Sequence, residues 1–92
     1  MENLELNSTT PKEVIWFENI IQDGVHSHEI ERCLNENLTS NERKAIVLRF
    51  GLEGEKLTGQ KLVKRMRMPD VIVGLLIMSG LSKLSAALSR AA

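Results

Sequence analysis

The sequence predicts an all-α fold, a small bundle of about five helices that contains a helix-turn-helix. Proline occurs only at positions 11 and 69, so few points interrupt a helix. Apolar residues recur on single helical faces, whereas no segment alternates apolar and polar residues as a half-buried strand does. The 92 residues, 42% hydrophobic and 26% charged, are those of one small folded domain.

The chain opens with a polar segment and then a strong helix-start signal. Residues 1–9 show no apolar period, and we expect them to form a flexible arm. Thr10 can cap the first helix, Pro11 suits its first position, and Glu13 completes a capping box. Gly24 is expected to end this helix.

Two more helices are expected before the middle of the chain. Ser27 opens the second helix, which carries apolar residues at spacings of four: Ile30, Leu34 and Leu38. We interpret residues 10–37 as an acidic helical lead-in. Thr39 and Glu42 repeat the capping-box pattern before a third helix, and Gly51 is placed to close that helix in a left-handed conformation.

The remaining residues predict two helices joined by a short connection. Residues 52–56 form a loop, and Thr58 can cap a short fourth helix. A tight connection at Arg67 and Met68 leads to Pro69, where a fifth helix begins and runs toward the C-terminus. Two helices joined in this way have the outline of a helix-turn-helix.

Charge is divided unevenly along the chain although the formal net charge is zero. Residues 1–42 carry nine acidic and two basic side chains, whereas residues 43–67 carry eight basic and two acidic ones. A basic block of this kind indicates an anion-facing surface. The alternative is that the two blocks neutralise each other across the fold.

A segment in the second half of the chain follows a known pattern. Its residues are Leu38-Thr39-x-x-Glu42-Arg43-x-x-Ile46-Val47-Leu48-Arg49-Phe50-Gly51-Leu52, then Leu57-Thr58, and finally Gly80-Leu81-x-Lys83-Leu84. This pattern resembles the fourth conserved region of housekeeping-type bacterial sigma factors. Residues 38–92 are therefore interpreted as a sigma-region-four-like helix-turn-helix domain.

The resemblance implies two binding activities. In the family, this domain reads the upstream promoter hexamer and docks on the flap of the RNA polymerase β subunit. By position, Arg43, Thr58 and Lys83 would lie near DNA phosphates, which suits two cations and a helix N-terminus. The basic block extends this candidate phosphate-binding set to Lys61, Lys64 and Arg65.

The recognition helix departs from the family pattern. The family has Ser there, followed by Arg, Glu, Arg and later Gln, whereas this chain has Pro69, Asp70, Val71, Ile72 and Leu75. Apolar side chains can touch a thymine methyl group but cannot read guanine or adenine edges. The turn glycine of the family is replaced by Arg67. We therefore expect little or no sequence-specific DNA reading.

Two apolar groups are candidate partner-binding surfaces. The resemblance implies a groove for the flap tip, for which the candidates are Ile46, Val47, Phe50, Leu52 and Leu62, with Lys44 and Arg49 at the rim. Residues 71–78 are apolar on every side of a helix, so one face is either an interface or is covered by the acidic helices. The interface interpretation selects Val71, Ile72, Leu75 and Leu76 as partner-binding residues and allows a homo-oligomer.

No pattern in the chain indicates catalysis or a cofactor. Phosphate loops, nucleophile elbows and paired carboxylates are missing from the sequence, and we expect no enzyme activity. His26, His28, Glu29 and Cys33 lie close in sequence, but no second ligand group completes a tetrahedral metal site. The single cysteine and the lack of a secretory signal lead us to expect the cytoplasm. The longest apolar run has eight residues, whereas a membrane-spanning helix needs about 20, so we expect no membrane association.

The preferred interpretation is a transcription regulator that contacts the RNA polymerase β flap or a sigma factor through apolar surfaces, with weak nonspecific DNA affinity. The alternative is a small helix-turn-helix protein or sigma-like subunit that binds promoter DNA, with a dimer through the apolar helix as one form of it. A third interpretation is a pure protein-interaction module that retains only the fold.

Overall fold

The computed structural model describes residues 11–91, and within them every regular element is an α-helix. The all-α prediction is therefore confirmed for this part of the chain, whereas the predicted arm and the cap at Thr10 lie outside it. The helices are α2 (Lys12–Asp23), α3 (Ser27–Glu36), α4 (Ser40–Phe50), α5 (Gly59–Met66) and α6 (Asp70–Ala91).

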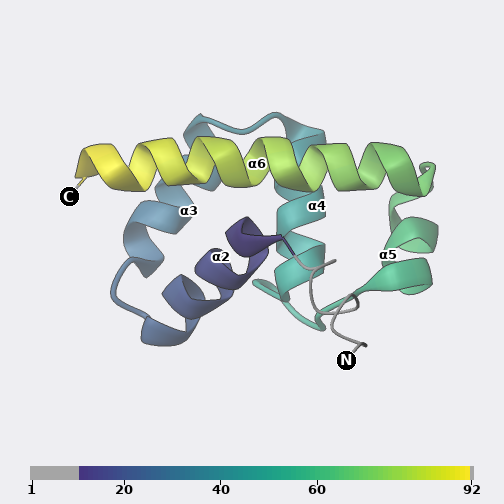
Figure 1. Cartoon of the computed structure of the whole chain (residues 1–92), viewed down its shortest axis with the longest axis horizontal. Coiled ribbons are helices and arrows are strands. Elements are labelled where there is room, and N and C mark those ends of the chain that lie inside the picture. Colours follow the sequence, from purple (N-terminus) through teal and green to yellow (C-terminus); the bar gives the residue numbers. More distant parts are fainter. Residues whose placement is uncertain (1–10, 92) are drawn as a thin grey trace, which may run out of the picture.

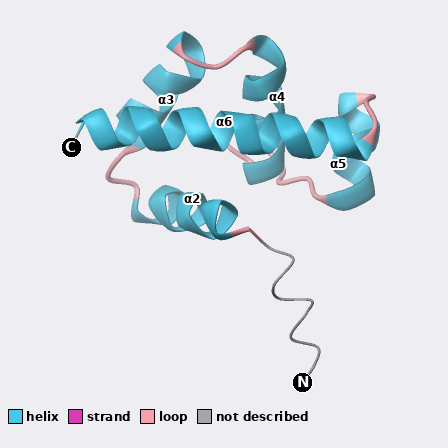
Figure 2. Ribbon diagram, turned by 45° about the horizontal axis from the view of Figure 1, so that its top comes forward, coloured by secondary structure: helices cyan, strands magenta, loops and turns pink. Residues whose placement is uncertain are grey.

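Helix α6 is the element around which the others are arranged. Its 22 residues span about 33 Å, and it contacts each of the other four described helices. Figure 1 shows α6 crossing the whole molecule, with α3 near its C-terminal end and α5 near its start, and Figure 2 shows the same arrangement from another side. The molecule thus has an α3 end and an α5 end along the axis of α6.

The local signals for helix α4 act as predicted. The Thr39 hydroxyl accepts a hydrogen bond from the backbone N–H of Glu42 at 3.2 Å, and the Glu42 carboxylate accepts one from the Thr39 N–H at 2.9 Å. Gly51 ends the helix with φ 68°. A Cβ atom at Gly51 would lie 3.1 Å from the Gly54 carbonyl oxygen and from Lys56. Both the positive φ and this close approach therefore favour glycine in the turn.

Two other helix starts differ from the prediction. Pro11 lies just before α2 rather than at its first position, and its carbonyl oxygen accepts hydrogen bonds from the N–H groups of Val14 and Ile15. Thr58 does occupy the N-cap position of α5, but its side chain accepts no hydrogen bond from the helix. The predicted end of the first helix at Gly24 and the predicted start of the second helix at Ser27 agree with α2 and α3. Leu38, predicted to lie on the second helix, comes after the end of α3 at Glu36.

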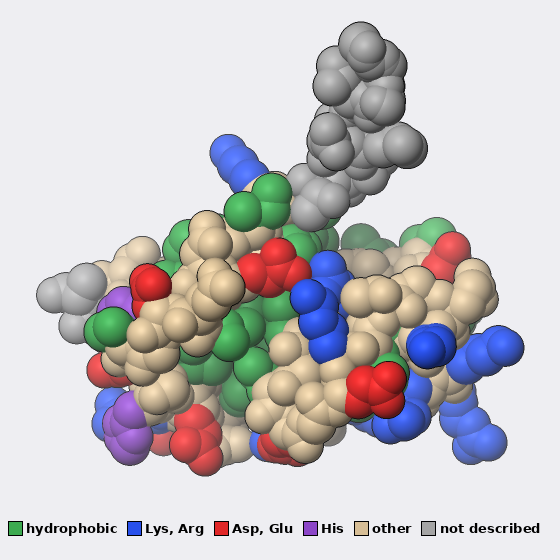
Figure 3. Space-filling view, turned by 90° about the horizontal axis from the view of Figure 1, so that it is seen from below, with side chains coloured by type: hydrophobic (Ala, Val, Ile, Leu, Met, Phe, Trp, Pro, Cys, Tyr) green, Lys and Arg blue, Asp and Glu red, His purple; other side chains and the backbone are tan. Residues whose placement is uncertain are grey.

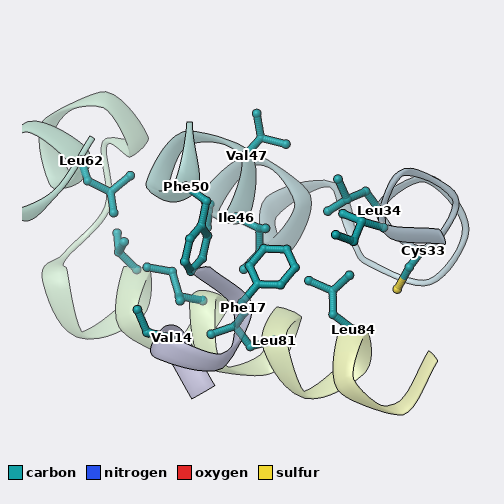
Figure 4. Close-up of a cluster of buried hydrophobic side chains, with 14 of the residues drawn as sticks. Val14, Phe17, Cys33, Leu34, Ile46, Val47, Phe50, Leu62, Leu81 and Leu84 are labelled. Carbon is teal, nitrogen blue, oxygen red and sulfur yellow. The ribbon is translucent and has the colours of Figure 1, made fainter. Parts of the chain in front are cut away.

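One continuous core lies between α6 and the other helices. Figure 4 shows Val14, Phe17, Ile46, Phe50 and Leu81 converging at its centre. The Phe17 ring meets the Phe50 ring edge-on, with centroids 4.8 Å apart. Helix α6 contributes one buried face, formed by Val73, Ile77, Leu81, Leu84 and Leu88.

Helices α2 and α3 belong to this same core. They bury Val14, Phe17, Ile30, Cys33 and Leu34 against the rest of the molecule. The acidic lead-in and residues 38–91 therefore share one hydrophobic core. Its burial supplies the main stabilisation of both parts, as expected for a domain of this size.

Candidate partner-binding and nucleic-acid surfaces

A hydrophobic pocket of about 190 Å³ lies where α2, α3 and the segment after α4 approach one another. Its lining is mostly apolar, from Ile20, Ile21, Ile30, Leu34 and Leu52. The other lining residues are Gly24, Ser27, Glu31, Arg43 and Glu53. Figure 3 shows hydrophobic side chains exposed in the middle of the face seen from below. A cavity of roughly 150 Å³ lined by such residues accommodates a benzene ring, so this pocket has room for one large apolar side chain of a partner.

An ion pair lies at the edge of this pocket. The Arg43 guanidinium is 2.8 Å from a Glu53 carboxylate oxygen and also donates a hydrogen bond to the Asn35 side-chain oxygen at 3.4 Å. The resemblance predicts Arg43 as a DNA-phosphate ligand. The structure instead pairs Arg43 with the carboxylate of Glu53 in the same chain, so a DNA phosphate would have to compete with Glu53 for it.

Most residues of the predicted flap groove lie in the core. Ile46, Val47, Phe50 and Leu62 are buried in the core, because α4 is covered by α6 on one side and by α5 on another. Leu52 alone of the predicted groove residues lines the apolar pocket. At the predicted rim, the Arg49 guanidinium lies 5.0 Å from the centre of the Phe50 ring, while Lys44 is exposed.

The basic side chains of α5 gather at one end of the molecule. A shallow hollow there is bordered by Lys61, Lys64, Arg65 and Arg67, with Glu55 as the acidic residue of the group. All four cations are exposed, and Figure 3 shows many Lys and Arg side chains at this end. We call these four residues the basic cluster. Thr58, also exposed, begins the same helix.

Arg67 belongs to the basic cluster but is not among the predicted phosphate ligands. It is the residue that follows α5, with φ 61°, and its left-handed conformation turns the chain toward α6. A sequence signal for it exists, because Arg67 is the last basic residue of the block at 43–67. An arginine there adds a positive charge next to those of α5.

Lys83 lies away from the basic cluster, in the middle of α6. Its ammonium group is 2.8 Å from a carboxylate oxygen of Glu42, which is only 5% exposed. Burial alone would raise the pKa of Glu42, but hydrogen bonds from Lys83, Ser79 and the Thr39 N–H outweigh it and lower the pKa to about 2. Lys83 therefore neutralises a buried carboxylate, and the predicted phosphate-binding role does not fit its position.

Three of the four apolar residues predicted to be exposed on the outer face of α6 are exposed. Val71, Ile72 and Leu75 are 67%, 41% and 61% exposed, whereas Leu76 is half-buried. The acidic helices cover only the opposite face of α6. By length and composition alone, residues 70–89 could cross a membrane, but the core helix of a soluble protein passes the same test.

Within residues 11–91, no three His, Cys, Asp or Glu side chains come together in a set that could hold a metal ion. What the described residues define is a small all-helical domain with an apolar pocket, a basic cluster and an exposed apolar helix face. No protein-family model matches the chain, and neither curated proteins nor solved structures gave a match.

Proposed function

We propose that this protein is a transcription regulator built on a sigma-region-four-like domain, and that it binds the RNA polymerase β flap or a sigma factor. The observation that carries the proposal is the apolar pocket formed by Ile20, Ile21, Ile30, Leu34 and Leu52. A pocket of this kind binds a partner helix or strand by one buried anchor side chain. In this proposal, α5, the connection at 67–69 and α6 form the helix-turn-helix.

The position of Leu52 supports the proposal. Leu52 ends the Arg49-Phe50-Gly51-Leu52 segment on which the resemblance depends most, and it lines the pocket. The backbone N–H of Leu52 donates a hydrogen bond to the Val47 carbonyl oxygen at 3.1 Å, and the Leu57 N–H donates one to the Leu48 carbonyl oxygen at 2.9 Å. These bonds hold the segment after α4 against the helix, so the pocket wall is held in place before a partner binds.

The test is binding to purified RNA polymerase, with and without its sigma factor, measured for a pair of matched variants. Ile21→Lys places a charge in the pocket, and Ile15→Lys makes the same change on an exposed side chain of the same helix. We expect Ile21→Lys to weaken binding at least about tenfold, because the lysine removes an apolar wall and adds a charge that must be desolvated when a partner's apolar side chain enters. Ile15→Lys should bind as the wild type does. Circular dichroism checks that both variants fold, and absence of measurable wild-type affinity for either partner contradicts the proposal.

The basic cluster favours nucleic-acid phosphate as a second ligand. Three exposed cations on α5 and Arg67 lie around one hollow, and cations so placed bind a phosphate backbone without reading sequence. The residues at the base-reading positions, Asp70, Val71 and Leu75, supply no donor suited to base edges. The function proposed for this cluster is weak, nonspecific DNA binding.

Salt dependence tests this second function. Binding of a labelled DNA duplex is measured by fluorescence anisotropy between about 50 and 200 mM salt. The double variant Lys61→Gln/Lys64→Gln should lower the salt slope by about two units, since each neutralised phosphate contributes roughly 0.9 to the slope. Lys12→Gln/Lys44→Gln removes the same charge elsewhere and should leave the slope nearly unchanged. Protection of one defined hexamer at physiological salt contradicts nonspecific binding.

A further inference from the structure

We infer that the exposed face of α6 binds a second copy of this chain, with the two α6 helices antiparallel. This inference goes beyond the proposed function and uses none of the pocket residues. It rests on the composition of that face, on the order of large and small side chains along it, and on the charges at the two ends of the molecule.

The exposed face of α6 carries no charged side chain over five turns. Between positions 71 and 89 the only charged residue is Lys83, whose ammonium group is bound to Glu42. The face instead exposes Val71, Ile72 and Leu75, together with serines, Gly74 and Ala86. A helix face on the surface of a monomer ordinarily carries charged residues, so this face has the composition of a helix-packing surface.

The side chains along this face follow the spacing of a coiled-coil seam. The steps alternate between four and three residues: Val71, Leu75, Met78, Ser82, Ser85 and Ser89. The first three are large and apolar, and the last three are small. Val71 and Leu75 are exposed, whereas Met78 is half-buried against the core. An antiparallel pair centred near position 80 places each large side chain opposite a serine. A parallel pair would place large against large and leave the serine half loosely packed.

The charges at the two ends of the molecule favour the same orientation. The α5 end holds the four cations of the basic cluster, which outnumber the two acidic residues near them, Glu55 at the hollow and Asp70 at the start of α6. The α3 end holds four acidic residues and one arginine between 23 and 36. Figure 1 places α5 and α3 at opposite ends of α6. Antiparallel pairing brings the basic end of one copy next to the acidic end of the other, whereas parallel pairing brings like charges together.

The first test is the oligomeric state of the purified full chain, measured by sedimentation equilibrium. We expect a dimer for the wild type. Ser85→Lys and Leu75→Lys should each raise the dimer dissociation constant at least about 100-fold, because a lysine packed in this uncharged seam has no acidic partner. Val25→Lys changes an equally exposed apolar side chain outside α6 and should remain dimeric. A wild type that stays monomeric up to millimolar concentration overturns the inference, as does a monomer that floats with phosphatidylcholine–phosphatidylserine vesicles.

The second test is the orientation of the two helices, by disulfide cross-linking under mild oxidation. The double variant Leu75→Cys/Ser85→Cys should form covalent dimers, and so should a mixture of the two single variants. The Leu75→Cys variant alone should not, because the two copies of position 75 lie about 15 Å apart along an antiparallel pair. Wild-type protein, whose Cys33 is buried, is the control. Efficient cross-linking of Leu75→Cys alone would show parallel helices and overturn the antiparallel assignment.

Discussion

The Glu42 carboxylate in α4 accepts a hydrogen bond at 2.8 Å from the Lys83 ammonium in α6, across 41 positions of sequence. The same carboxylate also accepts hydrogen bonds from the Ser79 hydroxyl and the Thr39 N–H. One side chain therefore completes the cap of α4 and attaches that cap to the middle of α6. Because Glu42 is buried, its negative charge depends on these partners.

Stability should fall in acid because of this carboxylate. The pKa of Glu42 is about 2 in the folded protein and 4.5 for an ordinary glutamate. Its contribution is therefore complete above about pH 6 and is lost as the pH falls from about 5 through 2. We expect Glu42→Gln to cost about 2 kcal/mol at pH 7, allowing for the partial exposure of Lys83, and to cost little near pH 2. Urea unfolding from pH 7 to pH 2 measures this. Glu53→Gln, at an exposed ion pair, is the control, and an equal pH response of the two variants would contradict the assignment.

Two glycines of α6 should respond in opposite directions to alanine. A Cβ at Gly80 would lie 2.9 Å from Cγ1 of the buried Ile46, whereas one at Gly74 meets nothing within 4 Å. Gly74→Ala should therefore stabilise the protein by about 0.5–1 kcal/mol through helix propensity. Gly80→Ala should destabilise it by about 1–3 kcal/mol, since α4 and α6 must separate. Thermal unfolding followed by circular dichroism gives both values, and a stabilised Gly80→Ala variant would show that this contact is looser than the structure indicates.

Replacing Arg67 by glycine should stabilise the fold. Arg67 has φ 61°, a left-handed conformation that costs a non-glycine residue about 1 kcal/mol. We expect Arg67→Gly to raise the unfolding free energy by up to about 1 kcal/mol. Arg65→Gly removes the same charge from inside α5 and should lower stability by about 1 kcal/mol. Chemical denaturation gives the unfolding free energy of both variants. A loss of stability in Arg67→Gly would mean that the arginine side chain stabilises the fold by more than its left-handed backbone conformation destabilises it.

Charge at position 47 should unfold the protein. If Val47 faced the predicted groove, Val47→Asp would fold normally and lose only partner binding. Val47 is 7% exposed, however, and belongs to the core. We expect a loss of about 3 kcal/mol or more, because a carboxylate there has no partner. Asn41→Asp, exposed in the first turn of the same helix, should be neutral or slightly stabilising. A cooperative, unshifted melting curve for Val47→Asp would restore the groove interpretation.

The ends of the helices could be predicted from sequence because the signals that set them are local. Gly24 and Gly51 adopt left-handed conformations directly after the helices that they end, α2 and α4. The capping box joins Thr39 and Glu42, three positions apart. Ser27 is the first residue of α3, and Asp70 is the first residue of α6, directly after Pro69. Each signal acts within about one turn of helix, so a single sequence contains it.

The burial of α4 could not be predicted in this way. Its apolar residues lie on several sides of the helix, so the pattern identifies no single buried face. Val47 and Phe50 suit a groove by residue type, yet both are only 7% exposed, and the Phe50 ring packs edge-on against Phe17 of α2. The outer face of α6 shows the reverse case, since Leu75 is of core type but has no covering helix.

By itself, the sequence therefore determined the helical class, most of the helix boundaries and the separation of acidic from basic segments, all of which depend on composition and short-range spacing. Only the tertiary structure decided that Lys83 pairs with the buried Glu42 and Arg43 with the exposed Glu53, and that Leu52 joins residues of α2 and α3 in one pocket. Those outcomes depend on which distant segments come together when α6 buries its inner face. That choice reflects the summed burial of the whole core rather than a preference of any one residue.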